Sequence, residues 1–219
     1  MDSESLRDEK VKVLKSIPAL EAGDIVRGQF RGYRQEHGVA ANSQVETFAT
    51  VRLHLDSWRW QGVPFYIRTG KCLPVTSTEV VVRLRQPPTV YPTAAPLPNY
   101  FRFSIVPKQT IAFGVTTMDE GDRMIGQRTE LVASREPGAD EQAAYDRVLT
   151  DALAGDATLF ARMDYVEESW RIVDPVLAMK TPVREYEPGT WGPTDRPDDP
   201  VPPRGWANPA TEEKVSAHA

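Results

Sequence analysis

Residues Trp58–Lys71 read Trp-Arg-Trp-Gln-Gly-Val-Pro-Phe-Tyr-Ile-Arg-Thr-Gly-Lys, an apolar segment between a tryptophan pair and two cations. Its middle part, Val63–Ile67, is β-branched and aromatic without a helical period, which predicts a mostly buried strand. Gly70 allows the backbone to turn or a ligand to approach closely. Arg68 and Lys71 then place two cations that could bind a phosphate or a carboxylate. The alternative is a solvated basic turn without a ligand, because most charged turns are solvated surface.

The composition places the chain among globular proteins and argues against two classes of partner. Its 219 residues suffice for one large domain or two small ones with a buried core. A net charge of −5, with the basic residues scattered along the chain, argues against binding to nucleic acid or to a membrane surface. No apolar run approaches the roughly 20 residues that a membrane-spanning helix needs.

Other short features narrow the chemistry. The N-terminal residues 1–5 lack the basic and apolar regions of a secretory signal, so a cytoplasmic location is predicted. The single cysteine, Cys72, excludes an internal disulfide and a cysteine-based metal cluster. It is either a reactive thiolate or, as we favour, an ordinary thiol at the end of a strand. No metal site is expected, because the histidines lie far apart without ligand spacing: His37, His54 and His218.

Periodicity predicts helices at both ends of the chain and strands between them. Residues 5–17 favour an amphipathic helix with Leu6, Lys10, Val13 and Ile17 on one stripe, ended by Pro18. Strands are predicted at residues 24–30, 47–56, 63–67, 79–85, 101–106, 110–116 and 127–134. The pattern then turns helical, with helices predicted from Asp140 to Gly155, from Asp156 to Ala161, and from Tyr165 to Ala178 with Val166, Trp170, Val173 and Leu177 on one face.

These elements together predict an α+β fold: a large, mainly antiparallel sheet backed by helices. From Thr181 onward the chain is rich in proline and is expected to be irregular. Trp191 and Trp206 suggest that parts of this segment dock on the body of the protein. We therefore expect one domain over residues 1–193 and a proline-rich, partly disordered tail over residues 194–219.

Several blocks of sequence, in this order, resemble the C-terminal domain of glucose-6-phosphate dehydrogenase. They are Asp8–Lys15, Gly28–Tyr33, Glu46–Ala49, Trp58–Lys71 and Trp170–Pro175, and the similarity runs from about Arg7 to about Pro193. The resemblance implies a large, mainly antiparallel sheet with helices on one face. In that family the other face of the sheet forms a subunit dimer, so a homodimer through the sheet is expected.

The resemblance also implies an activity, the NADP-dependent oxidation of glucose 6-phosphate to 6-phosphogluconolactone in the pentose phosphate pathway. A dinucleotide cradle needs glycines between a strand and a helix, and the chain contains no GxGxxG motif and no P-loop. The family's catalytic histidine and its His-Tyr-x-x-Lys block lie upstream of where this chain begins. We therefore expect no catalytic residue in this chain, no NADP bound by this chain alone and no turnover by the isolated chain. A separate chain could supply the coenzyme domain.

The resemblance assigns Lys71 to the substrate site as a positive point charge on the sugar phosphate, with Arg68 as a second substrate-binding residue. The alternative for both is a surface charge or a structural ion pair. The sequence departs from the family at Thr76 and, in the hairpin, at Ser104 and Val106, where basic or amide residues are usual. A second, structural NADP site known in some members would need basic residues near Ser77, Val81 and Ser104, so none is expected. The rival reading is a non-catalytic homodimeric module or a decayed copy.

Overall fold

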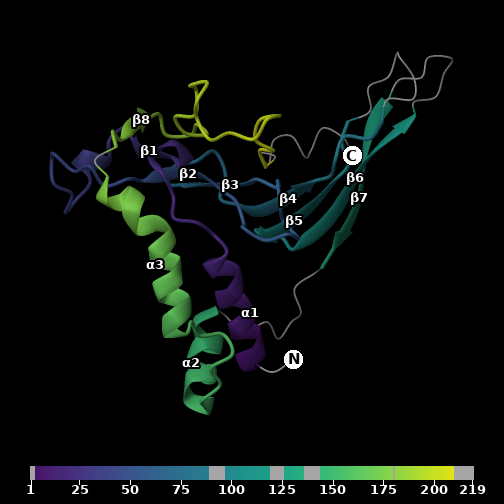
Figure 1. The fold of residues 1–219 in the computed structure, drawn as a ribbon. Helices are drawn as coiled ribbons and strands as arrows, with labels where there is room; N and C mark the ends of the chain where they lie inside the picture. The colour runs from purple at the N-terminus through teal and green to yellow at the C-terminus, as the bar shows by residue number, and fades with distance from the viewer. Residues whose placement is uncertain (1–2, 89–96, 119–125, 136–143, 180, 210–219) are drawn as a thin grey trace. The chain divides into compact units, whose positions relative to one another are not determined.

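The computed structural model describes residues 3–88, 97–118, 126–135, 144–179 and 181–209 (Figure 1). The chain forms two compact units, the first made of Met1–Pro74 with Gln142–Trp206 and the second of Val75–Glu141 with Ala207–Ala219. Each unit contains one four-stranded sheet. Within the described residues, none of the helices combines the length and the apolar character needed to cross a membrane.

The first unit contains the helices and a mixed sheet with strand order β3-β2-β1-β8. Strands β1, β2 and β3 are antiparallel neighbours, and β8 runs parallel to β1. In chain order its elements are α1 (Ser3–Lys15), β1 (Ile25–Phe30), β2 (Phe48–Leu53), β3 (Phe65–Gly70), α2 (Ala144–Ala154), α3 (Met163–Ala178) and β8 (Arg184–Tyr186), with short 3-10 turns at Ala22–Asp24 and Tyr33–Gln35.

The second unit is an antiparallel sheet of consecutive strands, in the order β4-β5-β6-β7. These strands are β4 (Thr78–Arg83), β5 (Tyr100–Val106), β6 (Thr110–Met118) and β7 (Gly126–Ser134). The predicted hairpin of β5 and β6 is confirmed, with Phe101 opposite Phe113 in the register. Most of the proline-rich connection before β5 lies outside the described residues.

The predicted α+β class is confirmed, and the strands divide between two sheets. Two local predictions are wrong. The proline-rich segment after Thr181 contains β8, which is too short to show a period of its own and is found only through its pairing with β1. No helix forms between Asp156 and Ala161. Instead, the Asp156 carboxylate accepts the Thr158 backbone N–H at 2.9 Å and closes a local turn.

Burial agrees with the predicted stripes only in part: Ile17 and Val173 pack into the core as predicted. In α1 the buried side is formed by Val11 and Leu14, whereas Leu6 and Val13 are exposed. In α3 it is formed by Ile172 and Val176, whereas Trp170 and Leu177 are exposed. The residues that α1 and α3 turn toward each other decide which side is buried, and a stripe read from one helix cannot locate its neighbour.

The C-terminal ends of α1 and α3 lie against one face of the first sheet, and the two helices project away from it (Figure 1). The core beneath them consists of Ile17, Leu20, Leu55, Ile172 and Val176, with Ile25, Val51, Leu53 and Phe65 packed against it from the strands. Arg171 of α3 fixes the end of α1, because its Nη2 donates to the carbonyl oxygens of Leu14 at 3.0 Å and Ile17 at 2.7 Å. Free C-terminal carbonyls of a helix need such donors. Two of the sequence blocks that resemble the family, Asp8–Lys15 and Trp170–Pro175, are therefore in contact here.

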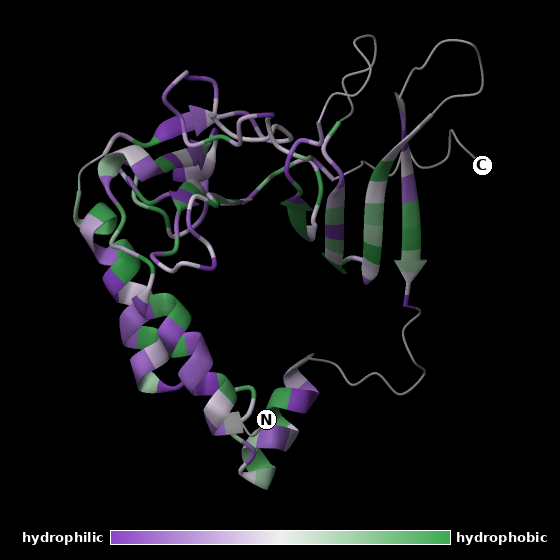
Figure 2. Ribbon diagram, turned by 45° about the vertical axis from the view of Figure 1, so that its right-hand side comes forward, coloured by the Kyte–Doolittle hydropathy of each residue, from purple (hydrophilic) through white to green (hydrophobic). Residues whose placement is uncertain are grey.

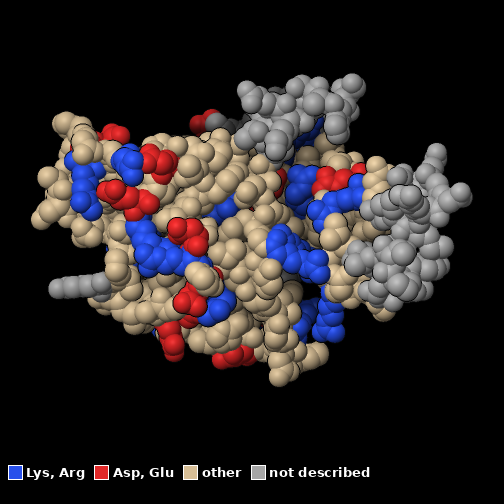
Figure 3. All heavy atoms as spheres, turned by 90° about the horizontal axis from the view of Figure 1, so that it is seen from above, with Lys and Arg blue, Asp and Glu red and all other residues tan. Residues whose placement is uncertain are grey.

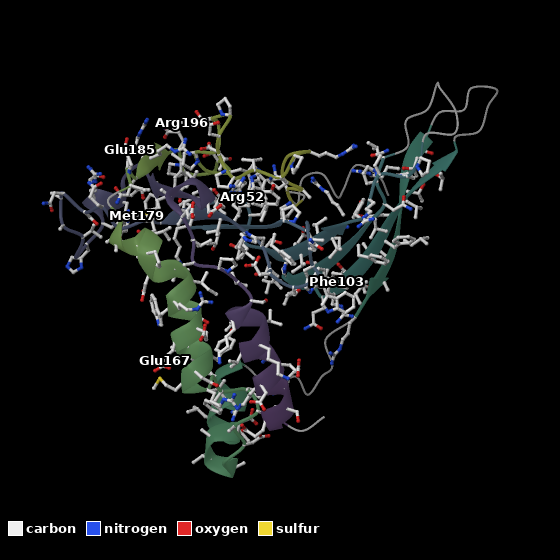
Figure 4. The ribbon with its side chains drawn as sticks, viewed as in Figure 1. Arg52, Phe103, Glu167, Met179, Glu185 and Arg196 are labelled. Atoms are coloured by element: carbon white, nitrogen blue, oxygen red, sulfur yellow. The ribbon has the colours of Figure 1, made fainter. Side chains whose placement is uncertain are left out.

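Residues 187–206, which we call the C-terminal strap, cover the opposite face of the first sheet (Figure 1). Pro193 lies against Gly28 of β1, where a Cβ atom would come within 3.0 Å of the proline Cγ. Asp199 pairs with Arg184 of β8, with 2.6 Å between Oδ1 and Nη2. In Figure 4, Arg196 of the strap and Glu167 of α3 lie on opposite sides of this sheet. The first sheet is therefore covered on both faces.

The second sheet has one polar face and one apolar face. On the polar face, Arg102 binds Glu130 and Glu79, and the Tyr100 hydroxyl donates to Glu130 at 2.5 Å. Hydrophobic residues recur along these strands in Figure 2. By the register, the other face carries a continuous set of exposed apolar side chains, which we call the apolar face: Val80, Val82, Phe101, Phe103, Ile111 and Leu131.

Candidate functional site

The blocks that carry the family resemblance meet at Thr47, next to β2. Its hydroxyl accepts the Phe30 N–H of β1 at 2.9 Å, and its own N–H donates to the Gly28 carbonyl at 2.8 Å. Its carbonyl accepts the Lys71 N–H, also at 2.8 Å. The first residue after β3 is thereby tied by its backbone to β2 and β1. A side chain carried on such a rigid support is better positioned than one on a free loop.

Tyr186 of β8 also fixes Lys71, through the carbonyl oxygen of Lys71 rather than through its N–H. Its buried hydroxyl donates to the Lys71 carbonyl oxygen at 2.7 Å, and its ring packs on Phe48 with the centroids 5.4 Å apart. Burial raises the pKa of Tyr186, so the hydroxyl keeps the proton that it donates. Sequence reasoning missed this residue, because it had placed no strand in the segment around it. A tyrosine flanked by charged residues gave no usable signal.

The turn that follows Lys71 is held by the strap. The Gly189 N–H donates to the Cys72 carbonyl oxygen at 2.8 Å. Cys72 has a φ of 51°, in the left-handed region that residues other than glycine seldom occupy. The thiol itself is exposed and forms no disulfide. The turn at 71–72 therefore has a fixed and mildly strained backbone that depends on β8 and the strap.

The side chain of Lys71, in contrast, is exposed. Within the described part of the chain, no hydrogen bond or ion pair engages its ammonium group. A rigid backbone with a free cation at its end can offer a point charge and up to three donors to an anion. The substrate contact predicted for Lys71 stays a prediction.

A glycine is needed at position 70 for neither of the two predicted reasons, which were a backbone turn and the close approach of a ligand. Its φ is not in the left-handed region, so the turn does not require it, and the positive φ lies at Cys72 instead. A Cβ atom at Gly70 would lie 2.8 Å from Cδ2 of Phe48. Phe48 is 2% exposed and also fills the space over Gly192, where a Cβ atom would overlap its ring. The close approach at Gly70 is therefore made by Phe48 of the core, not by a ligand.

Arg68 lies on β3 beneath the strap. Its Cζ is 4.4 Å from the ring centroid of Trp191 and 4.6 Å from that of Trp206, which confirms that both tryptophans dock on the body. Burial lowers the pKa of Arg68 to about 10, so it stays a cation at neutral pH. The direct substrate contact predicted for Arg68 stays a prediction, and the two indole contacts support the alternative of a structural role.

The predicted burial of the strand itself is wrong. β3 is an edge strand of its sheet, and Ile67 in its middle is 49% exposed. Of the tryptophans before it, Trp60 packs edge-on against Phe65 at 5.5 Å between centroids, whereas Trp58 projects into solvent. Because an edge strand is fixed on one side only, the strap contact at Arg68 matters more for its order.

The described residues do not fit a dinucleotide or a metal. Among the described residues no glycine-rich turn leads from a strand into a helix, and α3 is preceded by Arg162. No group of three or more metal-ligating side chains occurs among the residues that the structure describes. His54 is exposed and lies 3.5 Å from Asp56. Figure 3, seen from the strap side, shows acidic and basic side chains intermixed.

Comparison with known proteins gives a consistent result. The model of the family described as "Glucose-6-phosphate dehydrogenase, C-terminal domain" matches residues 1–198. Glucose-6-phosphate 1-dehydrogenase of Aggregatibacter actinomycetemcomitans is 37% identical over 89% of this chain and 43% of its own length. Glucose-6-phosphate 1-dehydrogenase 1 of Mycobacterium tuberculosis is 34% identical over 94% of this chain and 45% of its own length.

Solved structures agree with the sequence relatives. The crystal structure of glucose-6-phosphate 1-dehydrogenase from Mycobacterium avium superposes with a TM-score of 0.80 and 36% identity, over 88% of this chain and 42% of that one. A glucose-6-phosphate dehydrogenase in complex with its substrate glucose-6-phosphate superposes with a TM-score of 0.76 and 29% identity, over 88% and 43%. The chain thus spans less than half of the length of each of these relatives.

Proposed function

This chain belongs to the glucose-6-phosphate dehydrogenase C-terminal domain family, and from that membership we propose that it forms the substrate-binding and dimerisation part of a glucose-6-phosphate dehydrogenase. The assembled enzyme would oxidise glucose 6-phosphate with NADP in the cytoplasm. The observation that carries the proposal is the turn at Lys71, where a clamped backbone ends in an exposed ammonium group.

Lys71 would act on the phosphate group as a point charge. A phosphate monoester carries close to two negative charges at neutral pH and three acceptor oxygens, which suits an ammonium with three donors. A hydrogen bond to a charged group contributes about 1.5–3 kcal/mol, less than the roughly 4 kcal/mol that millimolar binding needs, so Lys71 would supply only part of the affinity. No proton transfer is assigned to Lys71. The base for the sugar hydroxyl and the cradle for NADP would come from a coenzyme domain.

A calorimetric titration tests the proposed binding of glucose 6-phosphate. The chain is titrated with glucose 6-phosphate and, in parallel, with glucose, which lacks the phosphate. We expect saturable, millimolar-range binding of glucose 6-phosphate that weakens as salt is added, and no heat of binding with glucose. Equal behaviour of the two sugars would contradict a phosphate-directed site.

The proposed need for a coenzyme domain is tested by measuring turnover. The 219-residue chain with NADP and glucose 6-phosphate is expected to produce no reduced cofactor. Adding a coenzyme-domain chain that supplies the glycine-rich motif and the catalytic histidine is expected to restore turnover. Activity that follows the 219-residue chain through purification, without such a partner, would show that the chemistry has been misassigned.

The proposed dimerisation rests on the apolar face of the second sheet. Large contiguous apolar surfaces are rare on monomers and mark interaction sites. The face combines aromatic and branched side chains, with Phe101 stacked on Phe113 at 4.7 Å between centroids. A second copy of the same face would cover it with like surface, as twofold symmetry requires. We propose a homodimer through this face.

A non-catalytic homodimeric module is the second candidate. The observation that favours it is the loss of usual basic residues at Thr76 and Ser104, both in the second unit. Ser77 beside the first of these donates its hydroxyl to the Val106 carbonyl at 3.2 Å and so serves the fold. A chain that dimerises yet fails to bind glucose 6-phosphate, and that no coenzyme domain activates, would favour this candidate.

A further inference from the structure

We propose that Arg68 is a positioning residue, which fixes the C-terminal strap on the edge strand β3 and thereby holds the turn that presents Lys71. This inference rests on the proposed function only for its last step, the binding of the sugar phosphate. Its mechanical part concerns the contacts of this chain with itself: Arg68 with Trp191 and Trp206, and Gly189 with Cys72.

The contacts form a closed path around the turn. Starting from Arg68, β3 runs two residues to its end at Gly70 and is followed by Lys71 and Cys72. The Cys72 carbonyl accepts the Gly189 N–H, and two residues farther along the strap Trp191 returns to Arg68. The path is therefore a ring of a few residues from each segment, closed at one end by a hydrogen bond and at the other by a cation–π contact.

Trp206 strengthens the closure from the far end of the strap. Its ring contacts Arg68 and also packs edge-on against Tyr66, two residues earlier on the same side of β3, at 6.5 Å between centroids. One guanidinium thus joins two indoles that are far apart in the strap sequence. A planar guanidinium can stack on aromatic rings in a way that a compact ammonium cannot.

The turn needs this support for two reasons. Among the described strands, β3 has a neighbour on one side only, so no strand restrains its outer edge. Cys72 also holds a left-handed φ that the chain would leave if its neighbours allowed it. Without the strap, the Cys72 carbonyl would lose the Gly189 N–H, and the hydrogen bond of the Lys71 N–H to Thr47 would open more often. The ammonium group would then sample a wider volume, and the affinity for a phosphate would fall because ordering costs entropy.

Amide exchange followed by NMR tests the mechanical part in the full chain without any ligand. The variants are Arg68→Ala and Trp191→Leu, with Trp191→Phe as the conservative variant and Arg59→Ala, in the exposed turn before β3, as the matched charge control. We expect the exchange of the Lys71 and Gly189 amides to rise about tenfold in the first two variants, as the loss of one or two cation–π contacts implies. Arg59→Ala should leave both amides unchanged, and Trp191→Phe should restore the protection only in part, because phenylalanine is a weaker cation–π partner than tryptophan.

Calorimetry with glucose 6-phosphate on the same variants tests the last step. Trp191→Leu removes no cation, so an affinity loss of about tenfold in this variant would identify positioning rather than charge as the role of the clamp. If Arg68→Ala weakens binding but Trp191→Leu does not, Arg68 touches the anion directly and the inference is overturned.

The two proposals fail in distinguishable ways. A wild-type chain that does not bind glucose 6-phosphate would refute the proposed function, while the exchange data would still decide on the clamp. Unchanged exchange at Lys71 and Gly189 in both Arg68→Ala and Trp191→Leu would refute the clamp, whatever the binding result. A global loss of protection in α3 would indicate unfolding, and Trp191→Phe, which keeps an aromatic ring, would then decide: faster exchange at Gly189 than in wild type supports the clamp, and unchanged exchange rejects it.

Discussion

Both sheets have four strands, yet they differ in what covers them. The sheet β3-β2-β1-β8 is packed on one face by α1 and α3 and on the other by the C-terminal strap. In the sheet β4-β5-β6-β7, side chains on the polar face form an ion network around Arg102. The other face is apolar and exposed. The first sheet is packed on both faces by residues of its own unit, whereas the second has an apolar face that the described residues of its own unit leave exposed.

This difference supports the two roles that we propose, a phosphate site in the first unit and a dimer interface in the second. A site that binds a small anion needs a rigid support, and the first sheet supplies one through the bonds around Thr47, Tyr186 and Lys71. A protein–protein interface needs complementary apolar area, which the second sheet supplies. Substitutions that change one sheet at a time would separate these roles.

The largest effect is expected from Phe48→Ala in the first sheet. Phe48 is 2% exposed, and its ring fills the space left by Gly28, Gly70 and Gly192. Removing it should lower the free energy of unfolding by about 3–5 kcal/mol. Phe103 of the second sheet, labelled in Figure 4, is 37% exposed, so Phe103→Ala should cost the monomer only about 1–2 kcal/mol. Urea unfolding measures both, and equal losses would remove the contrast between the sheets.

The next effect concerns association. Leu131 and Val132 are neighbours on β7, 64% and 56% exposed, and they point to opposite faces of the second sheet. Leu131→Glu would bury a charge in the proposed dimer interface and should weaken dimerisation about 100-fold or more. Val132→Glu, on the polar face, should leave it nearly unchanged. Sedimentation equilibrium measures the two dissociation constants. A dimer broken only by Val132→Glu would place the interface on the polar face.

The smallest effect is the response of each sheet to acid. Burial alone would raise the pKa of Glu46, but the hydrogen bond and charge of Arg27 outweigh it, so this pKa lies below its ordinary value. The pKa of Glu130 is lowered in the same way, against burial, by Arg102 and Tyr100. A lowered pKa stabilises the fold above the ordinary carboxyl value, and this contribution is lost as the pH falls through the folded value.

The variants Glu46→Gln and Glu130→Gln check this sign. Each should lower the midpoint of thermal unfolding relative to wild type at pH 7, and the difference should shrink below about pH 4. Differential scanning calorimetry across this pH range measures it. A difference that grows toward low pH would show that the carboxylates destabilise their sheets.

Much of the fold could be predicted from the sequence because its strands are long enough to show a period. Strands β5, β6 and β7 fall where their β-branched and aromatic residues indicated. Strand β8 could not be found this way, because the three residues Arg184–Tyr186 become a strand only by pairing with β1. The buried sides of α1 and α3 depend on how the two helices meet, which a single amphipathic stripe does not specify.

The candidate site was predictable in part for a similar reason. Lys71 was indicated by its place in a matched motif, and the structure adds that its backbone is fixed while its ammonium is exposed. The groups that fix it, Tyr186 and Gly189, lie more than a hundred residues away in a segment predicted to be irregular. The reason for Gly70 could not be found from the sequence, because its neighbour Phe48 is identified only by the cross-strand register.

The central claim is that the first sheet presents Lys71 to a sugar phosphate, and one calorimetric comparison tests it most directly. Glucose 6-phosphate is titrated into wild type, Lys71→Ala and Lys10→Ala, the last removing an equally exposed charge from α1. Loss of one charged hydrogen-bonding contact should weaken binding about tenfold to 100-fold in Lys71→Ala. Lys10→Ala should bind like wild type. Equal affinities of wild type and Lys71→Ala would contradict the claim.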